Sequence, residues 1–291
     1  QAPELLTAAI EKQSAFDFDS AKKYLTELVQ HCPDSPEAIE AKHRLPVLES
    51  LSREKQIYER INENAKRVLT DIGMNIANSP ELVDILMEAD AIDFESSAAV
   101  SMPLKRDYVD TCLDRVSRVL PLDPGPNAFG TGATPPFLKV NGETQLRSAT
   151  RDEFKVIVDA VGDNQDVVKI FSLPVATDKS ISSFEAAQMM EKGFKGLKMT
   201  AGKGFTDSEM DFFKGKDDWV DGTSLITTFT PMESMVTPFI RSAQSGSNLL
   251  LLDLSIAGSA AAGSPEALLT QIHAQVLFMM VVAQTNTPGI N

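Results

Sequence analysis

Hydrophobic residues recur at helical spacing through roughly the first 120 positions of the chain. Apolar side chains three and four residues apart, with charged residues between them, predict amphipathic helices. The segment Cys32-Pro33-Asp34-Ser35-Pro36 and the residue Gly73 are expected to punctuate them, as a helix start and a helix end. The predicted helical stretches are Ala2 to Leu51, interrupted at that break, then Leu51 to Asp71, Ser79 to Ala89, and Leu104 to Arg118.

The pattern changes after Pro121, where turn-forming residues dominate. Asp123-Pro124-Gly125-Pro126 and Gly130-Thr131-Gly132 predict a long loop. The pair Asn141-Gly142, flanked by short apolar runs, predicts a β-hairpin, since this dipeptide favours the type I′ turn.

From Ala149 onward, short apolar runs alternate with helical patterns. Alternating strands and helices predict a parallel sheet, and the continuous run Leu249 to Leu254 suits a strand buried on both faces. The predicted strands are Val167 to Val175, Gly196 to Thr200, Leu225 to Phe229 and Leu249 to Leu254. The predicted helices are Arg151 to Gly162, Phe184 to Lys192, Met235 to Ala243 and Ser264 to Gln284.

The fold class expected from this alternation is α/β: a partial (β/α)8 TIM-type barrel preceded by an all-helical N-terminal region. No glycine-rich dinucleotide or phosphate-loop motif follows a predicted strand, which disfavours an open nucleotide-binding sheet. About four strands are too few to close an eightfold barrel.

Four regions are expected along the chain. Residues 1–50 form a helical extension, either an ordinary one or a single tetratricopeptide-like hairpin, and residues 51–120 a helical cap. Residues 121–150 form a loop and a β-hairpin. Residues 151–291 form the first half of a TIM-type barrel.

Charge and cysteine content narrow the range of partners and locations. The net charge of -14 opposes binding to nucleic acid, which requires clustered Lys and Arg. Cys32 and Cys112 are far apart and lie in no metal-binding spacing, which fits a reducing cytoplasm and predicts no metal site. The longest apolar run, Val276 to Ala283, is too short to cross a bilayer, so no membrane contact is expected.

Several segments between about residue 50 and residue 291 resemble the trimethylamine/glycine betaine:corrinoid methyltransferase family. Ile57 to Gly73 is similar to the opening helix of that family, and Glu81 to Ala91 to its second helical segment. Gly142 to Asp152 resembles a family turn, and Phe229-Thr230-Pro231-Met232 stands where the family has a Ser-Pro-Leu loop. The small-residue stretch Ala257 to Glu266 occupies the place of another family loop, without its Pro-Val-Thr core, and Asn62 replaces the usual helix histidine.

The resemblance implies an enzyme of one-carbon metabolism or methanogenesis. Such a subunit moves a methyl group from trimethylamine, glycine betaine or a similar amine to the cobalt of a separate corrinoid protein. The cobamide therefore belongs to the partner, and no cofactor is expected on this chain. A homo-oligomer is also expected. The resemblance further implies a longer natural chain, because the C-terminal part of the family barrel is absent here.

A quaternary ammonium has no N–H donor, so its recognition requires aromatic faces, carboxylates or polarised oxygens around its methyl groups. The candidate substrate-binding residues are Phe129, Phe171, Phe229, Thr230 and Glu233. Barrel packing is the competing role for Phe171 and Phe229, and helix capping for Glu233. No catalytic residue can be assigned.

Lys198 and His273 each have two candidate roles, and the chain has an alternative function. Lys198, in a predicted strand, is either a catalytic amine or a structural side chain. His273 lacks an acidic or cysteine neighbour at ligand spacing and is expected to pack. The alternative function is a non-catalytic scaffold or assembly subunit whose incomplete barrel is completed by another chain.

Overall fold

The computed structural model describes residues 2–95, 101–116, 129–131, 147–166, 168–172, 180–200, 205–225, 229–259 and 261–290. These residues divide into two compact units, Gln1–Asn64 and Ala65–Asn291. Each unit has its own buried apolar cluster. The predicted hairpin around Asn141-Gly142 lies outside the described residues.

The first unit is helical, as the sequence predicts. Helix α1 (Ala2–Ser14) and helix α2 (Phe18–His31) form a hairpin that packs on the start of α3 (Pro36–Arg67). The side chain of Asp17 caps α2 by accepting a hydrogen bond from the Ser20 N–H at 3.2 Å. The core of this unit consists of small and aliphatic side chains, namely Ala9, Phe18, Ala21, Leu25, Leu28, Ala38, Ala41 and Leu48.

The separate helix predicted from Leu51 does not exist, because α3 continues unbroken from Pro36 through this position to Arg67. Pro46 lies inside α3 and removes one backbone hydrogen bond. Pro46 is exposed, so water can satisfy the carbonyl group that the missing N–H would have bonded.

A helical cap opens the second unit. It contains the π-helical turn η1 (Val68–Ile72), helix α4 (Pro80–Glu88) and helix α5 (Arg106–Arg115). Gly73 ends η1 with φ of 82°, and a Cβ atom there would lie 2.3 Å from the Met102 carbonyl carbon. Only glycine fits this close approach, which allows Met74 and Met102 to pair as an antiparallel bridge.

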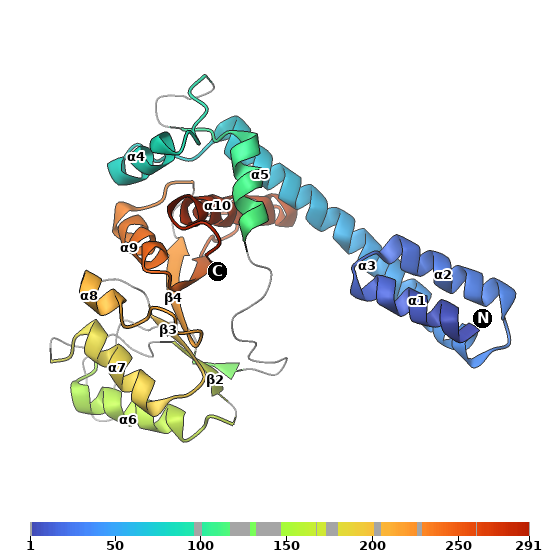
Figure 1. The fold of residues 1–291 in the computed structure, drawn as a ribbon, viewed down its shortest axis with the longest axis horizontal. Coiled ribbons are helices and arrows are strands. Elements are labelled where there is room, and N and C mark those ends of the chain that lie inside the picture. The colour runs from blue at the N-terminus through green and yellow to red at the C-terminus, as the bar shows by residue number, and fades with distance from the viewer. Residues whose placement is uncertain are drawn as a thin grey trace. The chain divides into compact units, whose positions relative to one another are not determined.

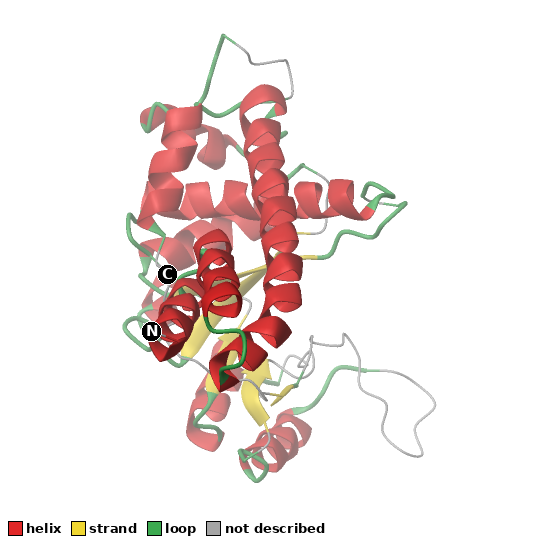
Figure 2. Cartoon of the chain, turned by 90° about the vertical axis from the view of Figure 1, so that its right-hand side faces the viewer, coloured by secondary structure: helices red, strands yellow, loops and turns green. Residues whose placement is uncertain are grey.

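The rest of the second unit alternates strands and helices around one parallel sheet (Figures 1 and 2). The five strands lie in the order β1-β2-β3-β4-β5, and every neighbouring pair is parallel. The strands are β1 (Phe129–Gly130), β2 (Val168–Ser172), β3 (Leu197–Thr200), β4 (Trp219–Leu225) and β5 (Asn248–Asp253). The helices are α6 (Arg151–Gly162), α7 (Ser183–Gly193), α8 (Asp207–Met210), α9 (Glu233–Gln244) and α10 (Pro265–Asn286).

Capping explains where three of these helices begin. Thr150, Ser182 and Thr206 each stand three residues before a glutamate and form complete capping boxes at α6, α7 and α8. At α6, hydrogen bonds from Arg147 and then from Thr150 lower the pKa of Glu153 to about 2.

All the sheet's helices pack on one of its faces. Phe171 and Trp219 belong to the apolar cluster that includes α6, α7 and α8, whereas Leu225 packs with α9 and α10. Trp219 and Leu225 lie an even number of residues apart on β4, so they point to the same face. Sequential strand order with helices on one face gives a curled half-barrel, whereas a doubly wound sheet has helices on both faces.

The opposite, concave face remains partly open at β5. Leu249 and Leu251 pack against the helices, while Leu250 and Leu252 are 36% and 37% exposed. Strict alternation along a strand produces this difference between its two faces.

One predicted strand has the wrong bounds. The strand expected at Leu225 to Phe229 begins earlier, because β4 runs from Trp219 to Leu225, and Phe229 has φ of 50°, which no strand residue adopts. Residues 226–228 of the predicted strand lie outside the described residues. Asp221, Gly222 and Ser224 make β4 look polar, so the β-branched residues that follow it gave the stronger signal.

Candidate functional site

The carboxyl end of the parallel sheet carries a group of polar contacts in the described residues. Between the first two strands, the Thr131 hydroxyl lies 3.0 Å from the Ser172 hydroxyl and accepts a hydrogen bond from the Ser172 N–H at 3.1 Å. In barrels of parallel strands, active sites are built at this end from the loops that follow the strands.

Asp253, the last residue of β5, is the centre of the largest polar network at this end. One carboxylate oxygen accepts the Ser255 N–H at 2.7 Å, which forms a turn that ends the strand. The other accepts the Gln275 side-chain amide at 2.6 Å. Gln275 lies on α10 and is only 2% exposed, so the network connects the strand end to the helix behind it.

Gln275 also holds the segment that precedes α9. Its side-chain carbonyl accepts the Phe229 N–H at 2.8 Å, and the Phe229 carbonyl accepts the Asn75 N–H at 2.8 Å. The N–H and the carbonyl of Phe229 are therefore both hydrogen-bonded. These bonds hold Phe229 in a left-handed backbone conformation that a bulky residue rarely adopts. Such strain persists only where the surroundings impose it, and it is common at functional sites.

The structure brings three of the five predicted site residues to this end of the sheet. Phe229 and Thr230 are half-buried, and Glu233 is the exposed first residue of α9. The backbone of Met232 leads directly into that helix, accepting the Val236 N–H at 3.0 Å. The Phe229–Glu233 segment is thus fixed by the network at one end and by α9 at the other.

The other two predicted residues lie elsewhere. Phe171 faces the helices with 0% exposure, and its ring packs edge-on against Phe194 with 5.5 Å between centroids. This is the packing role, and it leaves no aromatic face for a ligand. Phe129 lies on β1, at the edge of the sheet, and is 63% exposed.

Lys198 lies at the opposite, amino end of the sheet and has a structural environment. Its side chain is 1% exposed, with the ammonium 2.5 Å from Asp218 and 3.5 Å from Glu191. The Trp219 ring lies below it at 5.5 Å. A lysine held by two carboxylates at the end of the barrel associated with stability is a packing and pairing residue.

His273 is half-buried on α10, and burial, followed by the charge of Lys66, lowers its pKa. Within the described part of the chain, no group of three or more His, Cys, Asp or Glu side chains could hold a metal ion.

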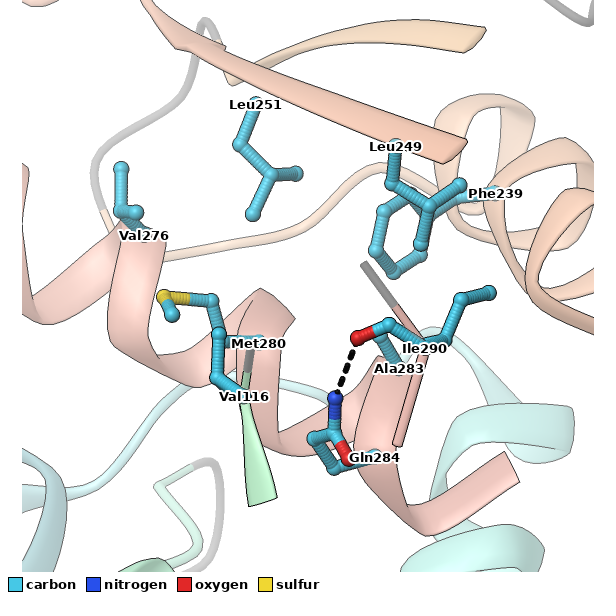
Figure 3. A pocket seen from close by; sticks show the side chains of 9 residues that line it. All are labelled: Val116, Phe239, Leu249, Leu251, Val276, Met280, Ala283, Gln284 and Ile290. Carbon is cyan, nitrogen blue, oxygen red and sulfur yellow. Dashed lines mark hydrogen bonds between the residues drawn. The ribbon is translucent and has the colours of Figure 1, made fainter. Parts of the chain in front are cut away.

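A separate apolar cavity of about 270 Å³ lies between β5, α9 and α10 (Figure 3). Gln284 is the one polar side chain among those lining it. Its amide is hydrogen-bonded through both nitrogen and oxygen, donating to the Ile290 carbonyl at 2.8 Å and accepting the Gly289 N–H at 2.7 Å. The cavity offers neither a carboxylate nor a free polarised oxygen, so it does not suit a cationic amine. Its lining comprises Val116, Phe239, Leu249, Leu251, Val276, Met280, Ala283, Gln284 and Ile290.

Helix α10, which carries Gln275, is by length and composition alone able to span a membrane. Half of its most apolar 18-residue window is buried inside the protein, and core helices pass the same test.

Sequence reasoning missed Asp253, Gln275 and Asn75. Asp253 has a recognisable signal, because an acidic residue directly after four leucines marks the end of a buried parallel strand. Gln275 has a weaker one, as an amide in the middle of an apolar helix. Their contact has no sequence signal, because it depends on how α10 packs behind β5.

Comparisons of the chain with protein-family models and with curated proteins find no match.

Proposed function

We propose that this chain is a methyltransferase subunit that moves a methyl group from a methylated amine to the cobalt of a corrinoid protein, and that its sheet is part of a (β/α)8 TIM-type barrel. The observation that carries the proposal is the Phe229–Glu233 segment, held at the carboxyl end of the sheet by Gln275 and Asp253. Within this segment, Phe229 to Met232 resemble the family's Ser-Pro-Leu loop. The cobamide remains on the partner protein, and this chain acts on the amine.

Methyl transfer of this kind requires little acid–base catalysis by the protein. The partner's cobalt(I) would supply the electron pair of the new cobalt–carbon bond, and the amine nitrogen would keep the electron pair of the broken carbon–nitrogen bond. The protein contributes by holding the cation in line and excluding water. Asp253 is a second carboxylate, besides Glu233, that can balance the positive charge of the substrate.

The two carboxylates differ in how firmly they are held. Asp253 is half-buried and fixed by two hydrogen bonds, whereas Glu233 is exposed at the start of α9. A fixed carboxylate interacts with a cation without first losing side-chain freedom. We therefore assign the larger share of cation binding to Asp253, with Thr230 lining the same site.

The test is single-turnover methylation of a cobalt(I) corrinoid protein, followed by absorbance. Trimethylamine, glycine betaine and related amines are offered in turn. Methylation with one of them supports the proposal and names the substrate. A folded protein that methylates with none of them contradicts it.

A second function, the scaffold subunit completed by another chain, is favoured by one observation. Leu250 and Leu252 expose aliphatic surface on the concave face of β5, and no described strand pairs with the outer edge of β5. Open edges and exposed apolar faces are typical of interaction surfaces. Native mass spectrometry of the wild type and of Leu252→Asp tests it: a larger assembly that the substitution abolishes supports the scaffold, and a monomer in both contradicts it.

A further inference from the structure

Asp221 is a carboxylic acid buried in the middle of the second unit. It lies on β4 and is only 3% exposed. Its neighbours in the sheet register are Thr200 of β3 and Leu249 of β5. Its side chain points toward α9, where it meets Ser242.

The hydrogen bonds of this carboxyl group are incomplete. One oxygen accepts the Ser242 hydroxyl, and the other has no hydrogen-bond partner in the described structure. An ionised carboxylate with a single hydroxyl partner is costly to bury, whereas the protonated acid is much less so. Burial accordingly raises the pKa of Asp221 to about 7, and the Ser242 hydrogen bond offsets only part of that effect.

No described cation compensates this charge. The nearest elements carry charged residues, but these are engaged elsewhere: Lys198 of β3 pairs with Asp218, and Arg241 of α9 with Asp207. Asp253 of β5 is bonded to Gln275, and Glu233 of α9 is exposed to solvent. The face that α9 presents around Ser242 is apolar and fully buried, consisting of Val236, Phe239, Ile240 and Ala243.

We propose that Asp221 is a pH-operated latch between β4 and α9. With its proton bound, the acid is compatible with the dry contact between the strand and the helix. When the proton leaves to water, a buried negative charge remains and α9 loosens from the sheet. The site segment loosens with it, because α9 begins at Glu233, directly after Phe229–Met232. This inference does not depend on the methyl-transfer proposal.

The direction of the effect follows from linkage. The folded-state pKa of Asp221, about 7, lies above the ordinary value of 3.8. The stability that protonated Asp221 contributes is therefore fully present below its unfolded-state pKa. This stability is lost as pH rises through the folded-state pKa. The β4–α9 contact is expected to be firm in mild acid and weak in mild alkali.

Hydrogen exchange measured by mass spectrometry tests the latch. Wild type and Asp221→Asn are compared at each pH from about 4 to about 8, because a comparison at the same pH cancels the intrinsic pH dependence of exchange. Peptides from α9 are expected to exchange alike near the lower pH, where Asp221 is largely protonated in both the closed and the open state, and roughly tenfold or more faster in the wild type near the upper pH. Peptides from α6 serve as the internal control and should not differ. Equal protection of α9 in the two proteins near the upper pH would overturn the proposal.

A second variant keeps the test decisive if Asp221→Asn fails to fold. Ser242→Ala removes the one hydrogen bond that favours the ionised form, so the loss of α9 protection should move to higher pH. Ser245→Ala is the matched control, because the Ser245 hydroxyl donates to the Ser242 carbonyl at 2.8 Å and does not contact Asp221. A midpoint that stays in place or falls in Ser242→Ala contradicts the latch.

Discussion

The two ends of the parallel sheet each carry a partly buried polar network, and the two networks are built differently. At the amino end, Lys198 and Lys216 pair with Asp218 and Glu191 beside the aromatic face of Trp219. At the carboxyl end, the one charged member, Asp253, is held by an amide and a backbone N–H. Among the described residues, the charges of the first network pair with one another, whereas no cation pairs with Asp253 in the second.

The amino end has further contacts between charged and aromatic groups. The Trp219 indole N–H donates to Glu191 at 2.6 Å, and the Lys216 ammonium lies 3.6 Å above the Phe212 ring. Every charged group there has an opposite charge or an aromatic face next to it, and the backbone has ordinary conformations. This end resembles the interior of a stable protein.

The carboxyl end holds a strained residue and an unbalanced carboxylate in a segment that is only partly buried. Neither feature helps stability, yet Gln275 maintains both. Stability in parallel barrels is associated with the amino end of the strands and function with the carboxyl end. The comparison of the two ends indicates that a candidate site lies where a protein keeps features that do not help its stability.

The largest expected effect comes from breaking the amino-end network. Lys198→Ala leaves Asp218 and Glu191 without their shared cation, and should lower the free energy of unfolding by about 3 kcal/mol. Urea denaturation measures it. Lys155→Ala is the control, because Lys155 makes only an exposed helix pair with Asp159, and it should cost under about 0.5 kcal/mol. Equal losses of unfolding free energy in Lys198→Ala and Lys155→Ala would contradict a structural role for Lys198.

A smaller loss is expected at the carboxyl end. Gln275→Leu leaves the Phe229 N–H unpaired and Asp253 with one donor fewer, and should cost about 2 kcal/mol in free energy of unfolding. It should also make the Phe229–Glu233 segment more susceptible to limited proteolysis. Gln244→Leu, at an exposed glutamine of α9, should change neither quantity. An intact segment in Gln275→Leu would show that other contacts hold it.

The contact between β1 and β2 should contribute less to the free energy of unfolding than the Gln275 contacts do. Thr131→Val keeps the shape of the side chain but removes the hydroxyl that bonds Ser172, at a cost of about 1 kcal/mol. Thr111→Val, which removes an exposed hydroxyl on α5, is the reference. If both variants unfold alike, the Thr131–Ser172 contact does not stabilise the edge of the sheet.

The smallest effect concerns pH. Desolvation raises the pKa of Glu191, but the hydrogen bonds from Lys216 and Trp219 and the charge of Lys198 outweigh it and hold this pKa below its ordinary value. The stability that Glu191 contributes is thus present above the unfolded-state pKa and is lost as pH falls through the folded-state value. Glu191→Gln should flatten the acid limb of the stability curve. An unchanged acid limb would contradict the charge balance of this end.

The sequence predicted the helices of the second unit better than its strands. Capping residues and helix-starting prolines mark the starts of α6, α7 and α10, so the positions of these helices can be predicted from adjacent residues in the sequence. The strand β4 could not be read in this way, because Asp221 and Gly222 are acceptable only in the packed sheet. The continuity of α3 through Leu51 was missed because the apolar stripe that begins at Ile57 was interpreted as a separate helix.

For the site, the sequence pointed to the segment but not to what holds it. Phe229, Thr230 and Glu233 are candidates because they lie at or just after the end of a predicted strand and include an aromatic ring and a carboxylate that suit a cationic amine. Gln275 and Asp253 are 22 positions apart and meet only through the packing of α10 on β5. The left-handed conformation of Phe229 also has no local signal, since it is imposed by Asn75 and Gln275 from outside the segment.

The assignment of the site to the carboxyl end is tested by single-turnover methylation of a cobalt(I) corrinoid protein with two carboxyl-end variants and one surface control. With the amine that the wild type uses, Asp253→Asn and Thr230→Val should slow methylation by roughly tenfold or more while the proteins stay folded. Lys155→Ala, far from the site, should methylate at the wild-type rate. Unchanged rates in both carboxyl-end variants would contradict the assignment of the site to this end of the sheet.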